Sequence, residues 1–126
     1  METKWIKISV LYLILGIAFG LFMHFTVELQ WAATHGHINV VGWLTTGLTG
    51  VIYAVYPEAG NSGLGKLHFW SYNIGLPFLL VGMMAIYLSP PGWLLELLVV
   101  GGGGLVTLGV LAFIINVFSN VRRVDG

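Results

Sequence analysis

The chain has 126 residues, of which 57% are hydrophobic and 8% are charged, and its mean hydropathy is +0.91. Because soluble domains carry about 25% charged residues, this composition excludes a water-soluble globule and indicates a chain largely surrounded by lipid. Five basic and five acidic residues give zero net charge, which offers no support for nucleic-acid binding. Cysteine is absent, which excludes disulfides, thiolate metal sites, iron–sulfur clusters and covalent c-type haem attachment.

Four apolar segments are each long enough to cross a membrane. A spanning helix needs about 20 mostly apolar residues, and such segments cover residues 5–23, 34–56, 67–88 and 93–118. The first resembles a secretory leader, but no small-residue cleavage pattern follows it, so we interpret it as an uncleaved span. Continuous apolar runs lack the alternation of barrel strands. We therefore predict a single-domain, all-α integral membrane four-helix bundle, with antiparallel neighbours because the connections are short.

All five basic residues fall at one end of this predicted bundle. Lys4 and Lys7 precede the first span, Lys66 lies between the second and third, and Arg122 and Arg123 follow the fourth. Basic residues concentrate on the cytoplasmic side of membrane proteins. We therefore expect both termini on the cytoplasmic side of a bacterial inner membrane, and we call this end of the bundle the inner end.

The four histidines divide between the two ends. His24, His35 and His37 belong to the outer end, whereas His68 belongs to the inner end. We expect His68 to lie at the membrane interface, and we keep it and His24 as weaker metal-ligand candidates. An aromatic belt at the membrane surfaces is predicted from the tryptophans at span ends, which are Trp5, Trp31, Trp70 and Trp93.

The histidine pair at the start of the second span is the strongest functional signal. Imidazole at membrane depth is costly unless it is paired or ligated. His35 and His37 point about 200° apart on a regular helix, so they cannot ligate one metal together but can serve two separate sites. Asn39 adds a polar group, and Gly36 and Gly42 would let a flat macrocycle approach the backbone.

Neutral imidazole binds haem iron, copper and zinc. Haem requires one or two axial histidines and an apolar slot beside small residues, and the sequence supplies these, so haem b is the predicted cofactor. One alternative is a copper, zinc or gas-sensing site that uses His24, His35 or His37, and the carboxylate of Glu28. Another is a structural subunit of a respiratory complex with incidental histidines.

Small and polar residues elsewhere predict helix contacts. Gly16 and Gly20 form a G-x-x-x-G pattern that allows another helix to approach closely. The four glycines at 101–104 favour either tight packing against a neighbour or flat ligand, or a flexible kink. Hydrogen bonds between helices or to haem propionates are expected from Tyr53, Asn73 and Asn116.

The second and third spans also carry motifs of a known family. The motifs are a histidine-x-asparagine entry at His37 and Asn39, a glycine-rich middle, and a tyrosine-to-proline exit at Tyr56 and Pro57. They resemble the second helix of the haem–copper oxidase catalytic subunit, in particular its nitric-oxide reductase branch, and the residues from Lys66 onward resemble that family's third helix. The resemblance covers residues 33–82, about two fifths of the chain.

This resemblance implies that His35 or His37 is an axial ligand of a low-spin haem near the outer face. The charge pattern independently places both histidines at that face. The family's catalytic subunit is built from three pseudo-equivalent four-helix groups and this chain contains one, which implies a homotrimer in which His35 of one subunit and His37 of the next hold one haem. The family's copper-site histidines and cross-linked tyrosine have no counterpart here. We therefore expect electron transfer or haem handling with a respiratory-chain protein as candidate partner, rather than catalysis by the chain alone.

Overall fold

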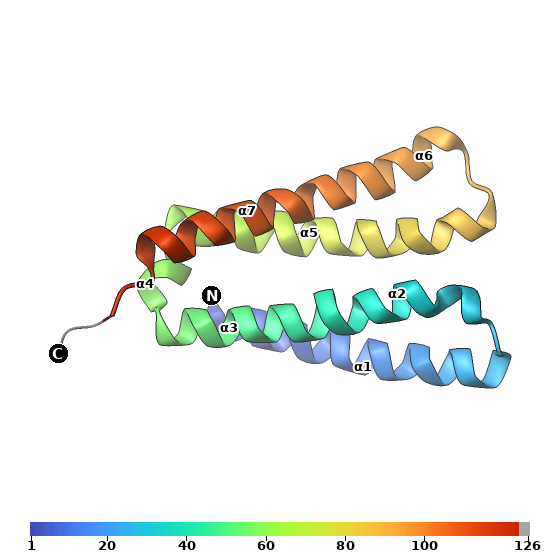
Figure 1. Cartoon of the computed structure of the whole chain (residues 1–126), viewed down its shortest axis with the longest axis horizontal. Coiled ribbons are helices and arrows are strands. Elements are labelled where there is room, and N and C mark those ends of the chain that lie inside the picture. The colour runs from blue at the N-terminus through green and yellow to red at the C-terminus, as the bar shows by residue number, and fades with distance from the viewer. Residues whose placement is uncertain (124–126) are drawn as a thin grey trace.

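The computed structural model describes residues 1–123, which form helices and no strand (Figure 1). The helical segments are α1 (Glu2–Thr26), η1 (Leu29–Trp31), α2 (Ala32–His37), η2 (Ile38–Leu44), α3 (Thr45–Val55), α4 (Pro57–Gly60), α5 (Gly63–Ala85), η3 (Ile86–Leu88), α6 (Gly92–Glu96), η4 (Leu97–Gly101) and α7 (Gly102–Asn120). They combine into four helices that are long and apolar enough to cross a membrane, namely Glu2–Thr26, Leu29–Val55, Gly63–Leu88 and Gly92–Asn120. The prediction of an all-α chain with four apolar helices is confirmed.

A polar cap and a proline set the boundaries of two of the long helices. The third long helix begins at Gly63 rather than at residue 67, because the Ser62 hydroxyl caps it by accepting a hydrogen bond from the Gly65 amide at 3.0 Å. The second ends at Val55, since proline disfavours a helical conformation at the residue before it, Tyr56. Hydropathy marks the apolar part of a helix and not its hydrogen-bonded ends, so the helix itself begins before the predicted span.

The four long helices form two hairpins (Figure 1). One consists of α1 and the second long helix, and the other consists of α5 with α7. The start of α1 and the end of α7 lie at the same end of the bundle, the inner end. The α5–α7 contact depends on glycine, because a Cβ added to Gly75 would come within 2.6 Å of Leu105 Cβ and 2.7 Å of the Gly102 carbonyl oxygen. The tight packing predicted for residues 101–104 therefore applies to Gly102, whereas Gly104 has no neighbour within 4 Å.

The hairpins share an aromatic core at the inner end. Trp5 of α1 is fully buried, and its ring centroid lies 4.6 Å from that of His68 and 5.4 Å from that of Phe69, both on α5. Trp31 is also buried, with 8% of its surface exposed. The predicted interfacial belt is therefore wrong for Trp5 and Trp31, whereas Trp70 and Trp93 remain exposed. Because Trp5 is on the side of α1 that faces α5, its ring fills the space between the hairpins.

Two of the long helices contain a wide π-helical stretch, η2 in the second and η4 in the fourth. Such stretches loosen the regular carbonyl-to-amide ladder and are frequent at functional sites. In η2, hydroxyl groups donate to two carbonyl oxygens: Thr45 donates to Val40 at 2.7 Å, and Tyr72 of α5 donates to Val41 at 2.6 Å. The Tyr72 bond therefore joins the two hairpins near the middle of the bundle.

The glycine contact between α5 and α7 gives a direct stability prediction. Gly75→Ala is expected to lower the free energy of unfolding by about 1–3 kcal/mol, because its methyl group meets backbone atoms that cannot move aside. Gly104→Ala is the matched control on α7, and it should be neutral or stabilising by up to about 1 kcal/mol. Unfolding by sodium dodecyl sulfate in mixed micelles measures both. Equal stability of the two variants would contradict the close contact.

Candidate functional site

His35 faces α1 and lies against the predicted G-x-x-x-G pair. Its Nε2 is 3.1 Å from the Gly16 carbonyl oxygen and 3.2 Å from the Asn39 side-chain nitrogen. Because a neutral ring nitrogen either donates or accepts, Nε2 serves one of these partners at a time. A Cβ on Gly20 would come within 3.0 Å of Nε2, and one on Gly16 would overlap the Asn39 amide oxygen. The two glycines thus make room for two polar side chains.

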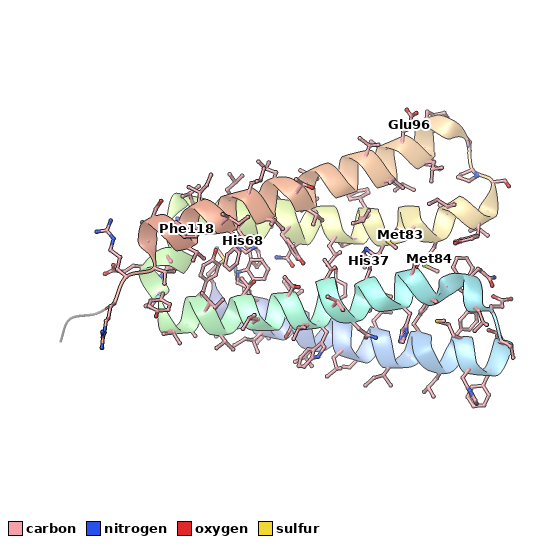
Figure 2. The ribbon with its side chains drawn as sticks, viewed as in Figure 1. His37, His68, Met83, Met84, Glu96 and Phe118 are labelled. Carbon is pink, nitrogen blue, oxygen red and sulfur yellow. The ribbon has the colours of Figure 1, made fainter. Side chains whose placement is uncertain are left out.

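His37 lies on a different side of the same helix and is exposed. In the view of Figure 2 its side chain extends from α2 on the side of the hairpin that faces α5. Its Nδ1 is 2.9 Å from the Ala33 carbonyl oxygen, which can only accept, so Nδ1 carries the hydrogen in this bond. In the neutral ring Nε2 then keeps its lone pair. Gly36 beside it has no neighbour within 4 Å of an added Cβ, so the backbone there is open.

The other predicted metal ligands do not join this pair. His24 is exposed near the end of α1, where its ring meets the edge of Phe25. The carboxylate of Glu28 accepts a hydrogen bond from the Trp31 indole at 2.9 Å. Within residues 1–123, no three histidine, aspartate or glutamate side chains gather as a group that could hold a metal ion. A single chain therefore gives no geometric support for the copper or zinc alternative.

Gly42 does not offer an open backbone to a ligand. The ring of Tyr12 on α1 covers it, and a Cβ on Gly42 would come within 2.7 Å of Tyr12 Cγ. The expectation that a macrocycle approaches Gly42 is therefore wrong, because an aromatic side chain from the neighbouring helix already fills that space. A cavity of about 420 Å³ lies nearby between the hairpins, with walls that include Tyr12, Phe19, Thr34, Ile38, Leu80 and Met84.

His68 is buried rather than interfacial, with 1% of its surface exposed. Its Nδ1 lies 2.8 Å from the hydroxyl of Tyr53. Asn116 of α7 donates to the Tyr53 oxygen at 3.1 Å and to the Ala59 carbonyl at 2.9 Å. The Tyr53 hydroxyl is thus free to donate to His68 Nδ1, which fits a neutral imidazole. The interfacial position predicted for His68 is wrong, because the Tyr53 hydroxyl of α3 pairs with its Nδ1 inside the bundle.

These residues belong to a larger group of hydrogen-bonded side chains, which we call the inner polar cluster: Tyr53, Ser62, His68, Asn116 and Asn120. The Ser62 hydroxyl lies 3.1 Å and the Asn120 amide nitrogen 2.7 Å from the Asn116 side-chain oxygen. The cluster links α3, α5 and α7 and so ties the two hairpins together. The hydrogen bonds between helices predicted for Tyr53 and Asn116 are confirmed. Asn73 instead bonds to Phe69 within α5.

Comparison with known proteins identifies no relative of this chain. No family model, no curated protein and no solved structure matches this chain. The resemblance of residues 33–82 to haem–copper oxidase helices therefore rests on their motifs alone. The geometry of the histidines and of the inner polar cluster is the structural evidence on function.

Proposed function

We propose that this chain is a membrane protein that binds b-type haem through His37 and serves in electron transfer or haem handling. The observation that carries the proposal is the bond from His37 Nδ1 to the Ala33 carbonyl, which leaves Nε2 as the free nitrogen on an exposed helix face. Metal-bound histidines almost always donate their other ring N–H to a carbonyl or carboxylate, which fixes the ring orientation. His37 has this arrangement.

The surroundings of His37 suit a flat, apolar cofactor. Ala33 and Gly36 are small, and Val40 and Leu44 present 55% and 57% of their surface on the same exposed stretch of helix. Such a face can contact a macrocycle closely and keep water away from it. Bound haem would supply a one-electron redox couple. The role of the chain is to orient the His37 imidazole and to supply this apolar contact.

His35 has a packing role in this proposal, because its Nε2 already forms a hydrogen bond with the Gly16 carbonyl or the Asn39 side chain. A second axial imidazole then has to come from another copy of the chain. Within residues 1–123, His24 lies on a different helix and His68 is buried at the inner end. This geometry supports a homo-oligomer, and the homotrimer implied by the family resemblance is the form we propose. The basic residues at the inner end support cytoplasmic termini in a bacterial inner membrane.

An absorption spectrum of the purified protein reconstituted with haem b tests the proposal. We expect a sharp α band in the reduced-minus-oxidised spectrum, because two imidazoles give a low-spin iron. Size-exclusion chromatography with light scattering in the same detergent should report an oligomer that carries the haem. A colourless protein containing stoichiometric copper or zinc would overturn the haem assignment. A monomer with full haem content would overturn the shared ligand.

A further inference from the structure

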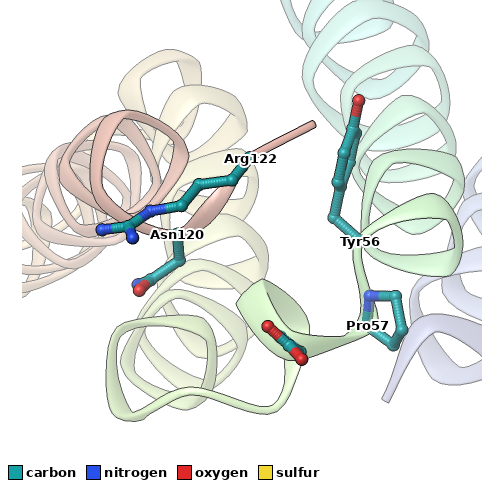
Figure 3. A pocket seen from close by; sticks show the side chains of 5 residues that line it. Tyr56, Pro57, Asn120 and Arg122 are labelled. Atoms are coloured by element: carbon teal, nitrogen blue, oxygen red, sulfur yellow. The ribbon is translucent and has the colours of Figure 1, made fainter. Parts of the chain in front are cut away.

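A second polar site lies at the inner end, away from His37. It is a pocket of about 400 Å³ lined by Tyr56, Pro57, Glu58, Asn120 and Arg122 (Figure 3). These residues come from the end of the second long helix, from α4 and from the C-terminal end of α7. The pocket thus lies where the two hairpins meet, and the haem proposal does not use it.

The pocket carries two opposite charges that do not neutralise each other. Glu58 and Arg122 both line it, yet the one salt bridge within residues 1–123 joins the Met1 amine to Glu2. The Nε of Arg122 donates to the Ser119 carbonyl at 3.3 Å, and Figure 3 shows its guanidinium directed away from Tyr56 and Pro57. A zwitterionic ligand would offer a partner to each of these two charges at once.

The position of the pocket along the bundle indicates which class of zwitterionic ligand can reach it. The second long helix ends at Val55 and the fourth at Asn120, so the pocket is at the depth where a membrane-spanning helix leaves the hydrocarbon. All the basic residues of the chain belong to this end, where cationic side chains meet lipid phosphates. Phospholipid headgroups are the abundant zwitterions of this layer.

We infer that this pocket binds the phosphoethanolamine headgroup of a membrane lipid, with the phosphate at Arg122 and the ammonium at Glu58. Arginine matches the geometry of phosphate oxygens. A primary ammonium has three N–H donors that the Glu58 carboxylate can accept. A choline headgroup has no such donors and is held by cages of several aromatic rings, whereas this pocket has the single ring of Tyr56. A glycerol headgroup offers Glu58 hydroxyl donors but no cationic partner.

Lipid binding at this pocket is coupled to the stability of the whole bundle. Asn120 lines the pocket, and its amide also donates to Asn116 in the inner polar cluster at 2.7 Å. A headgroup that fixes the end of α7 therefore also supports the junction between the hairpins. Because a ligand that binds only the folded state stabilises it, the bound lipid should raise the unfolding temperature.

The test uses haem-free protein in detergent with added dioleoyl phosphatidylethanolamine, phosphatidylcholine or phosphatidylglycerol. Native mass spectrometry counts the retained lipid, and tryptophan fluorescence follows thermal unfolding. We expect phosphatidylethanolamine to be retained about tenfold more than the other two, as one charge-assisted hydrogen-bonded pair would give. Glu58→Gln should remove this preference, and Arg122→Gln should lower the retention of all three lipids.

Two further substitutions serve as matched controls. Glu96→Gln removes an exposed carboxylate at the outer end, and Arg123→Gln removes the arginine next to Arg122, and neither residue lines the pocket. Both should behave as wild type. Equal retention of the three lipids, or identical behaviour of Glu58→Gln and Glu96→Gln, would overturn the proposal. So would soluble phosphoethanolamine that stabilises the protein as much as the lipid does, because the site would then belong to a free metabolite.

Discussion

Replacing His37 by alanine is expected to abolish the haem α band while the four helices remain folded. The substitution removes the exposed imidazole whose Nδ1 is already held by the Ala33 carbonyl. Loss of a supporting group around a metal ligand costs 10–100-fold in affinity, so loss of the ligand itself should weaken haem binding by about 100-fold or more. Haem titration followed by absorbance measures the affinity, and circular dichroism checks the helical content.

His35→Ala is the matched comparison two residues away. It removes a hydrogen bond to Gly16 or Asn39 inside the α1 hairpin, so it should lower the free energy of unfolding by about 1 kcal/mol. It should leave the α band intact. Free imidazole added to His37→Gly should restore the band, because it fills the site left by the side chain. Retention of haem by His37→Ala, or its loss in a folded His35→Ala protein, would contradict the assignment.

Asn116→Leu is expected to cause a large loss of stability. Asn116 is fully buried, donates to the Tyr53 hydroxyl and to the Ala59 carbonyl, and accepts from Asn120. Leucine has a similar branched shape but leaves these buried groups without partners, each at a cost of about 1–3 kcal/mol that is reduced where new partners are found. We expect the free energy of unfolding to fall by about 2–4 kcal/mol. Unfolding in mixed micelles of dodecyl sulfate and decyl maltoside measures this loss.

Thr107→Val on the same helix is the control for Asn116. The Thr107 hydroxyl donates to the Gly103 carbonyl within α7 and is exposed, so its removal should change stability by less than about 0.5 kcal/mol. A double-mutant cycle with Tyr53→Phe should show coupling to Asn116→Leu, because the two side chains share a hydrogen bond. If Asn116→Leu were as stable as Thr107→Val, the inner polar cluster would not hold the hairpins together.

The sequence by itself determined that the chain is helical and has four helices long and apolar enough to cross a membrane. Lipid cannot hydrogen-bond to the backbone, so a long run of apolar residues has to be helical there. The fixed turn of a helix also determined that His35 and His37 leave it on different sides. In the structure His35 contacts Gly16 of α1, while His37 lies exposed.

Only the tertiary structure decided which polar and aromatic groups meet. The interior position of His68 depends on Tyr53 and Asn116, which are 63 positions apart in the chain. Tyr12 covers Gly42, and Glu58 faces the same pocket as Arg122, through contacts between different helices. These contacts depend on how each helix is rotated and how closely glycines let the helices approach. Mean hydropathy carries no record of that rotation, because it averages over all sides of a helix, including buried polar residues such as His68 and Asn116.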